Sequence, residues 1–265
     1  AINAGGSTLH SFFKLPFYPL LPDDPNFSLK GGKLHSFLKY SSDHRKLIKN
    51  IELVIIDEIS MVRADLLDAV DSVLRRFRKN NLPFGGVQMV MIGDLGQLAP
   101  VAKDDEWQML SRYYATPYFF SSLALQRTRY AIVELTKVYR QSDKRFLDIL
   151  NKVRENRADA AVLSALNSRY IPDFKPRKDD GYIRLTTHNW QAQRINDHEL
   201  ELLPGKSYTY TATIEGKYPE MLFPTDETLT LKTGAQVMFV KNDSSADKAY
   251  YNGMIGTIAE IDAEG

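Results

Sequence analysis

Several features are missing from this sequence of 265 residues. Cysteine is absent, which excludes a disulfide framework and a thiolate metal site and favours a reducing compartment. No apolar run reaches the roughly 18 residues that a membrane-spanning helix needs. Residues 1–6 are small and uncharged, unlike the basic and then apolar start of a signal peptide. We therefore expect a protein of the cell interior.

A strong charge of either sign is also missing, since the formal net charge is +1. This value neither requires nor excludes a nucleic-acid partner, because charges cluster locally. One basic cluster comprises Arg75, Arg76, Arg78 and Lys79. What is present is an ordinary globular composition, with 43% hydrophobic and 25% charged residues. The length of 265 residues is enough for one large domain or two to three smaller ones.

A strand, helix, strand unit is predicted in the first half of the chain. Residues 53–56 are a short apolar run, typical of a strand buried on both faces of a parallel sheet. Apolar residues then recur at helical spacing over residues 66–77, and a second apolar run follows at residues 90–92. A right-handed crossover makes the two strands parallel.

Acidic residues follow both predicted strands. Asp57 and Glu58 end the first strand and Asp94 follows the second, so the three should meet at the carboxyl edge where open α/β sheets bind ligands. An acid there can hold Mg²⁺ while its neighbour orients water, as in a Walker B box. The alternative is structural, because apolar strands commonly end in acids where the chain surfaces.

Two further segments could act on phosphate. Residues 93–100 form a glycine-containing turn in which the Gln97 amide can bond both a phosphate oxygen and a water, although a plain glycine turn is the alternative. Arg140 precedes an amphipathic helix and could neutralise charge on a transferred phosphoryl group. Taken alone, such an arginine is more often a surface ion pair.

The rest of the chain divides by composition. Residues 14–40 interleave prolines with aromatics and predict an inserted loop or small subdomain. A second α/β section is expected from about Tyr130, with a new helix starting at Asn189. From Lys206 the pattern predicts strands at residues 208–212, 235–240 and 254–261, which suggests a small β-barrel.

The order of these pieces resembles the petite-integration-frequency family of DNA helicases, within the RecD-like superfamily 1B. The resemblance covers nearly the whole chain, and no single motif in it is highly specific. The matching segments are residues 1–13 (motif Ia), 57–61 (motif II), 67–77 with 84–86 (the family signature), 93–100 (motif III), 135–141 (motif IV), 186–196 (the next motif), and 234–238 with 251–253 (the barrel insert).

The resemblance implies an ATP-dependent 5′-to-3′ helicase with ATP and Mg²⁺ as cofactors. It places Asp57 on Mg²⁺, Glu58 on the attacking water, and Asp94, Gln97 and Arg140 at the nucleotide, with Gln97 and Arg140 acting on the γ-phosphate. Single-stranded DNA contacts fall on two segments, Thr8, His10, Ser11 and Phe12, and Thr187, His188 and Asn189. At least one of Phe12 and Phe13 is expected to be a core residue instead.

The family's phosphate-cradling G-x-x-x-x-G-K-[ST] loop is not found among these residues. The only Gly-Lys-Ser triplet, Gly205 to Ser207, follows Pro204 and has Leu200 where the motif needs its first glycine. The resemblance therefore predicts a helicase core truncated at both ends, which should not turn over ATP by itself.

We expect an α/β fold of partial RecA-like P-loop NTPase motor domains with a small SH3-like β-barrel. The predicted domains are residues 1–127 with a wedge-like insert at about 14–47, residues 128–205, and residues 206–265. The resemblance implies forked or quadruplex DNA as further partners, a monomeric state, and work in DNA repair, recombination and telomere maintenance. It implies a cytoplasmic or nucleoid location in a bacterium, and a nuclear or mitochondrial one in a eukaryote.

Two other functions stay open from the residues alone. Asp57, Glu58 and Asp94 could form a metal-dependent nuclease cluster, which leaves Gln97 and Arg140 without roles. The chain could also be a non-catalytic module that binds single-stranded DNA.

Overall fold

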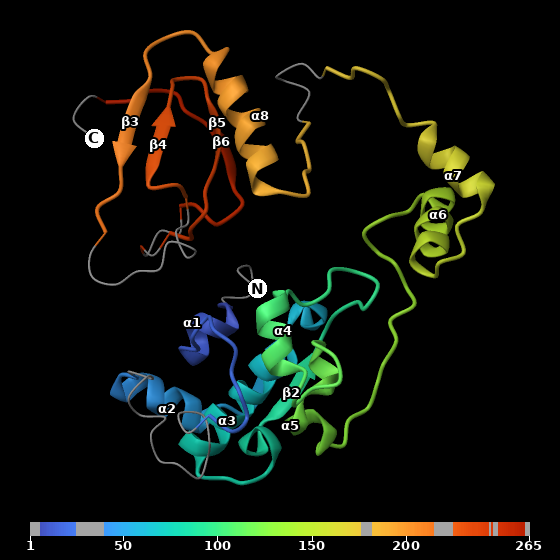
Figure 1. The fold of residues 1–265 in the computed structure, drawn as a ribbon, viewed down its shortest axis with the longest axis vertical. Helices are drawn as coiled ribbons and strands as arrows, with labels where there is room; N and C mark the ends of the chain where they lie inside the picture. The colour runs from blue at the N-terminus through green and yellow to red at the C-terminus, as the bar shows by residue number, and fades with distance from the viewer. Residues whose placement is uncertain are drawn as a thin grey trace. The chain divides into compact units, whose positions relative to one another are not determined.

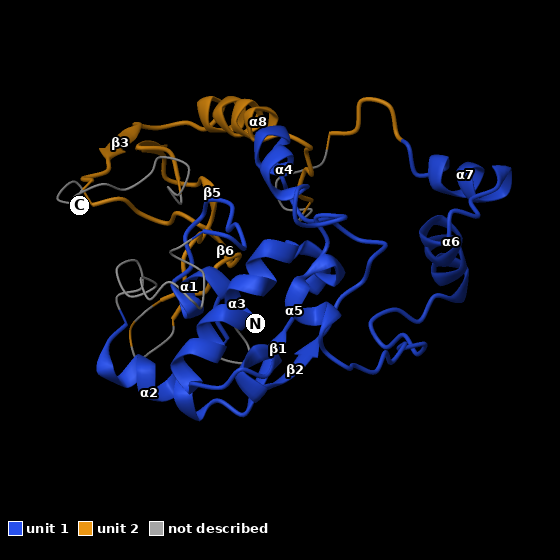
Figure 2. Cartoon of the chain, turned by 60° about the horizontal axis from the view of Figure 1, so that its bottom comes forward, with its two compact units in different colours: residues 1–170 blue, residues 171–265 orange. Residues whose placement is uncertain are grey.

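The computed structural model describes residues 6–24, 40–175, 182–214, 225–243, 245 and 249–262. The chain divides into two compact units, residues 1–170 and 171–265 (Figures 1 and 2). The expected division into three domains stays a prediction. Residues 1–5 of motif Ia and residues 25–39 of the expected insert lie outside the described residues. No described helix is long and apolar enough to cross a membrane.

A parallel pair of strands is the centre of the first unit. Strand β1 (Leu53–Ile56) pairs with β2 (Gln88–Met91) in the register Leu53 to Gln88 and Ile56 to Met91. Between them the chain passes through α3 (Ala64–Arg78), so the predicted strand, helix, strand unit is confirmed. Two short 3₁₀ turns flank α3, η3 (Ile59–Met61) and η4 (Pro83–Gly86).

Helix α3 has one face in the hydrophobic core. Leu67, Val70, Val73 and Leu74 are fully buried at a spacing of three to four residues. The charges at its ends favour the helix as well, with Asp65 in the first turn and three arginines in the last. Figure 1 shows α2 (Ser42–Asn50) lying beside α3, and Ile48 of α2 joins the same core.

The prediction that β1 is buried on both faces was wrong. Val54 and Ile56 face the core together with Met89 and Met91 of β2. The alternate residues do not, because Leu53 is 47% exposed and Ile55 is 60% exposed. A strand alternates its side chains between two faces, and in the described part of the chain α2 and α3 pack on one of them only.

Three aspartates on α3, two buried and one partly buried, hold neighbouring segments of the chain in place. Asp65 accepts a hydrogen bond from the backbone N–H of Leu20 at 3.0 Å, and Asp71 accepts one from Phe84 at 2.6 Å. Asp68 accepts from the N–H groups of Leu123 and Ala124 at 3.0 and 2.9 Å. Each bond satisfies an amide that would otherwise be buried without a partner.

The remaining helices of this unit are short. They are α1 (Leu9–Phe13), α4 (Asp104–Leu110), the 3₁₀ turn η5 (Phe119–Ser121), α5 (Leu123–Gln126), α6 (Lys144–Arg154) and α7 (Ala160–Asn167). Asp143 and Asp159 cap the N-termini of α6 and α7 with their carboxylates. Leu15 and Leu20, from the expected insert, are buried in the main core.

The second unit contains α8 (Asn189–Glu201), which begins where the sequence predicted, and two separate antiparallel pairs. Strand β3 (Tyr208–Thr211) pairs with β4 (Thr228–Leu231), and β5 (Gln236–Met238) pairs with β6 (Ile255–Thr257). The predicted strands are therefore present in shorter form. Among the described residues they form no closed barrel.

We expect Asp68→Ala to destabilise the first unit by about 1–3 kcal/mol, because removing this partly buried carboxylate leaves its hydrogen-bond donors without an acceptor. Those donors are the two amides of α5, the Ser122 hydroxyl at 2.6 Å and the Tyr114 hydroxyl at 2.9 Å. Urea unfolding would measure the change. Asp148→Ala is the matched control, since in the described part of the chain that exposed aspartate makes a surface pair with Lys152 and no other ion pair. Equal losses in both variants would contradict the proposed anchoring role.

Candidate functional site

The carboxyl ends of β1 and β2 form one edge of the parallel pair, and the predicted acidic residues lie there. The ladder continues past the strands, since Ile92 N–H donates to Ile56 O at 2.8 Å and Ile59 N–H donates to Ile92 O at 2.9 Å. Asp57 and Glu58 are therefore held next to the segment that begins at Gly93.

Glu58 has a left-handed backbone, with φ 53° and ψ 43°. This conformation costs a non-glycine residue of the order of 1 kcal/mol and is concentrated at functional sites. It turns the chain from β1 into η3, and the Asp57 Oδ1 accepts the Glu58 N–H at 3.0 Å. Both acidic residues are exposed to solvent.

Gly93 allows the two strand ends to approach this closely. A Cβ atom at this position would lie 2.9 Å from Ile59 Cγ2 and 3.1 Å from the backbone nitrogens of Ile59 and Ser60. Real Cβ atoms essentially never come within 3.0 Å of another heavy atom. Only glycine therefore fits without displacing η3, which directly follows Asp57 and Glu58.

Asp94 is already engaged by its own neighbours. Its Oδ1 accepts the Gly96 N–H at 2.9 Å and lies 3.2 Å from the Arg154 guanidinium of α6. Its Oδ2 is 3.4 Å from the Gln97 side-chain amide. The Gly96 bond, followed by Gln97 and Arg154, holds the pKa of Asp94 below its usual range against an opposing effect of burial. Asp94 thus stays ionised and shapes the loop that carries Gln97.

Arg140 is not brought to this edge. It is exposed, and in the described part of the chain no hydrogen bond or ion pair connects it with Asp57, Glu58 or Gln97. Arg154, fourteen residues later on α6, does reach the site and pairs with Asp94. Sequence reasoning missed Arg154, because an arginine in the last turn of a helix also fits simple stabilisation of the helix dipole.

The nuclease alternative requires a cluster of metal-ligating side chains. Among the described residues, no group of three or more His, Asp or Glu side chains is arranged to hold a metal ion. Asp57, Glu58 and Asp94 share an edge but do not converge. Asp57 is exposed, and among the described residues its only hydrogen bond is at Oδ1, so Oδ2 could serve as a single carboxylate ligand.

The predicted DNA contacts in the first unit lie on and just before α1. Thr8 caps the helix, its hydroxyl oxygen accepting the Ser11 N–H at 3.2 Å, and both residues are exposed. Phe13 is buried, which confirms that at least one of the two phenylalanines belongs to the core. Phe12 is partly buried and packs against that core.

His10 stacks on an aromatic ring that the sequence analysis did not single out. The Phe17 ring lies 4.6 Å away and within 1° of parallel, and Phe17 is 54% exposed. Burial, and then the nearby Arg63, lower the pKa of His10 from its ordinary 6.5, against the effect of Asp65. The imidazole is therefore uncharged at neutral pH and can donate one hydrogen bond.

In the second unit, Thr187, His188 and Asn189 form the start of α8 and are exposed. The Thr187 hydroxyl lies 2.9 Å from His188 Nδ1, and no side chain caps the helix. The first backbone N–H groups of α8 are thus open to an acceptor, which is the usual setting for an anion at a helix N-terminus.

Comparisons with known proteins match this chain to helicases. A family model described as PIF1-like helicase matches residues 1–162. The ATP-dependent DNA helicase PIF1 of Saccharomyces cerevisiae is 34% identical over 98% of the chain and 29% of its own length. The human ATP-dependent DNA helicase PIF1 is 37% identical over 82% of the chain and 33% of its own length. The chain thus spans about a third of these curated relatives.

Solved structures of Pif1 helicases are similar to this chain as well. A Bacteroides Pif1 helicase in complex with ADP-AlF₃ and single-stranded DNA superposes with a TM-score of 0.82 at 39% identity, covering 99% of this chain and 58% of that one. A second structure, described as two coordinating Pif1 helicases at forked duplex DNA, gives a TM-score of 0.80 at 41% identity, over 99% of this chain and 59% of that one. The fold is therefore that of RecA-like helicase motor domains.

We expect Gly93→Ala to destabilise the first unit by about 1–3 kcal/mol, the usual cost of overpacking, and to displace η3. Chemical denaturation would measure the loss. Gly96→Ala is the matched control, because its nearest new neighbour is the flexible Arg154 side chain at 3.1 Å. If both substitutions were equally mild, the close approach of the two strand ends would not constrain the site.

Proposed function

We propose, because this chain belongs to the PIF1-like helicase family, that the full-length protein is an ATP-dependent DNA helicase. The observation that carries the proposal is the shared carboxyl edge of β1 and β2, which presents Asp57 and Glu58 beside the loop of Gly93 and Gln97. ATP bound with Mg²⁺ would supply the phosphoryl group whose transfer to water drives movement along DNA.

Each residue at this edge has one proposed task. Asp57 would hold Mg²⁺ through the carboxylate oxygen that its neighbour's amide leaves free. Glu58 would orient the attacking water and take its proton at the carboxylate. Gln97, on the loop shaped by Asp94, would bond the γ-phosphate.

Arginines would complete the nucleotide site. Arg140 remains our proposed partner of the γ-phosphate, on the strength of its motif, and its exposed side chain is free of ion pairs among the described residues. Arg154 already lies beside Asp94 and would add positive charge next to the same loop. Guanidinium groups suit this role because they remain charged and bond phosphate through two donors.

DNA would contact two segments through its backbone. Thr8, His10 and Ser11 offer hydroxyl and imidazole donors at α1, with Phe12 or the exposed ring of Phe17 available to a base. Thr187, His188 and Asn189 offer side chains and open amides at the start of α8. We also propose that the full-length protein moves in the 5′-to-3′ direction, unwinds forks or quadruplexes, and acts as a monomer.

The four strands of the second unit are proposed to be parts of one SH3-like barrel. The support is the two antiparallel pairs, whose strands are three to four residues long, because short antiparallel strands are the elements of such a barrel. A helicase that works on chromosomal DNA would act in the nucleoid or cytoplasm of a bacterium, or in the nucleus or mitochondrion of a eukaryote.

In the full-length protein, we expect Glu58→Gln to keep nucleotide binding and to lower kcat for ATP by about 100-fold or more, because an amide keeps the shape but cannot take a proton. Fluorescent-nucleotide titration and phosphate release would measure the two quantities. Glu52→Gln, an exposed acid at the other end of β1, is the matched control. A normal kcat in Glu58→Gln would remove this residue from the mechanism.

We expect His10→Ala to weaken single-stranded DNA binding by about 2- to 10-fold, the value of one hydrogen bond, with no preference for any sequence. Because the imidazole is uncharged at neutral pH, the salt dependence of binding should not change. Fluorescence anisotropy on poly-dT and mixed oligonucleotides would measure both.

A thermal melt separates the two roles of His10. The lowered pKa means that the unaltered protein loses stability as pH falls below 6.5, and His10→Ala should abolish that part of the loss. Exposed His198, at the far end of α8, gives the control variant His198→Ala. Unchanged affinity with an unchanged melt would show that α1 is not a DNA contact, and a collapsed melt would make His10 structural.

A further inference from the structure

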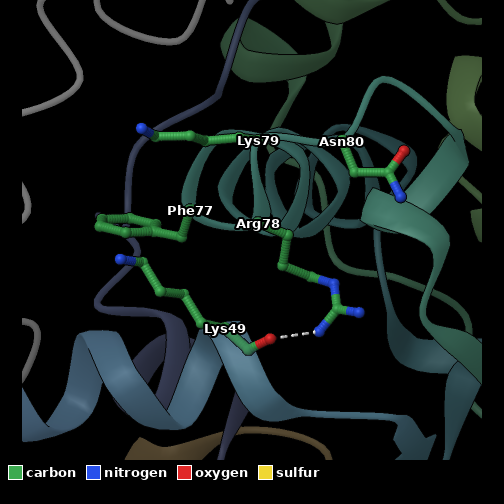
Figure 3. Close-up of a pocket in the computed structure, with 5 residues that line it drawn as sticks. All are labelled: Lys49, Phe77, Arg78, Lys79 and Asn80. Atoms are coloured by element: carbon green, nitrogen blue, oxygen red, sulfur yellow. Dashed lines mark hydrogen bonds between the residues drawn. The ribbon is translucent and has the colours of Figure 1, made fainter.

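A basic hollow lies between the C-terminal ends of α2 and α3. It has a volume of about 310 Å³ and is lined by Lys49, Phe77, Arg78, Lys79 and Asn80 (Figure 3). Three of these side chains are cationic, one is aromatic, one is an amide, and none is acidic. Cations around an aromatic ring are the combination that binds nucleic-acid strands without reading their sequence.

The basic residues between positions 75 and 79 differ in the partners they have in the structure. Arg75 lies 3.4 Å from the Asp71 carboxylate and is committed to the helix itself. Arg78 donates to three backbone carbonyls, those of Lys49 at 2.7 Å, Ile51 at 2.6 Å and Gly85 at 2.9 Å. Lys79 has no ion pair among the described residues, and the same holds for Lys49 across the hollow.

The Arg78 bonds also hold the main chain at Lys49 close to the main chain at Lys79. They tie the end of α2 to the residue that directly precedes Lys79. Lys79 itself ends α3 in a left-handed conformation, with its N–H bonded back to the helix. The main chain at both lysines is therefore held in place before any ligand arrives, which lowers the entropic cost of binding.

Figure 3 shows the ammonium groups of Lys49 and Lys79 on the same side of the hollow, with the Phe77 ring between them. The Arg78 guanidinium is turned away from them toward the Lys49 carbonyl. Phe77 packs edge-on against Tyr40, with ring centroids 4.9 Å apart, so its position is fixed as well.

This hollow is distinct from the candidate nucleotide site. The chain enters β1 directly after α2, and Gln88 at the start of β2 donates to Glu52 O at 3.0 Å. The hollow therefore lies toward the amino ends of the strands, whereas Asp57 and Asp94 lie at their carboxyl ends. Neither α1 nor α8 contributes a residue to it.

We propose that Lys49 and Lys79 form a lysine clamp for the phosphodiester backbone of DNA, as an additional contact beyond α1 and α8. The proposal rests on the proposed helicase function. Two ammonium groups flanking a ring would each neutralise one phosphate, while Phe77 would pack against the sugar or base between them. The competing explanation is that each lysine only balances the negative end of its own helix.

Salt-dependent DNA binding by the full-length protein tests the clamp. The double variant Lys49→Gln with Lys79→Gln removes both charges and keeps most of each stem. We expect about tenfold weaker binding near physiological salt, and a slope of log affinity against log salt that is shallower by about 1.4 on single strands or 1.8 on duplex, for two phosphates. The maximal ATPase rate should stay unchanged, while the DNA concentration for half-stimulation rises.

Three probes and two control variants make the result specific. A poly-dT strand, a blunt duplex and a tailed duplex would be compared by anisotropy, and the probe that loses affinity shows whether the clamp holds a single strand or a duplex arm. The variant Lys49→Arg with Lys79→Arg should keep the slope. Lys46→Gln removes an exposed charge from the same helix and should cost less than twofold.

The salt dependence of the double glutamine variant and the loss in Lys46→Gln decide between the clamp and its alternatives. An unchanged slope in the double glutamine variant, with or without a lower melting temperature, overturns the clamp and leaves the helix-end explanation. An equal loss in Lys46→Gln also overturns it, because net charge would then explain the effect. If the unaltered protein binds none of the three DNAs, the helicase proposal itself fails, whereas normal binding that ignores both lysines rejects the clamp alone.

Discussion

Three carboxylates on one helix organise much of the first unit. Asp65, Asp68 and Asp71 recur every three residues along α3, and each accepts backbone N–H groups from a different segment of the chain. Burying these charges is costly, and Arg63 and Arg75 offset part of that cost. Apolar packing places α3 against the sheet. Hydrogen bonds from the aspartates of α3 then position the segments around this helix.

Local patterns made part of this structure predictable. Helical periodicity located α3, and short apolar runs that end in acids located β1, β2 and their shared edge. The exposure of Ile55 was not predictable, because a strand's own sequence does not say what covers each face. The pairing of Asp94 with Arg154 joins residues 60 positions apart, so it left no local pattern. Strand β4 was missed although its sequence, Thr-Leu-Thr-Leu, alternates polar and apolar residues as strands do.

The near-zero net charge conceals a division within the first unit. The carboxyl edge of the strands presents Asp57 and Glu58, while the opposite end presents Lys49 and Lys79. Arg78 donates to the carbonyls of Lys49 and Ile51 and so ties the end of α2 to the end of α3 beside these lysines. Negative and positive charges are thus concentrated at opposite ends of the strands. The electrostatic potential near each end depends on these few side chains and not on the net charge of the protein.

The left-handed backbone at Glu58 implies a trade-off between stability and activity. A glycine at that position would adopt the same turn with less strain, and the folded state would gain of the order of 1 kcal/mol from the relief, less the greater chain entropy of glycine when unfolded. The protein would then lose the carboxylate at the edge of its sheet. A search for more stable variants of this chain would be drawn toward that substitution, so Glu58 should be held fixed in any such design.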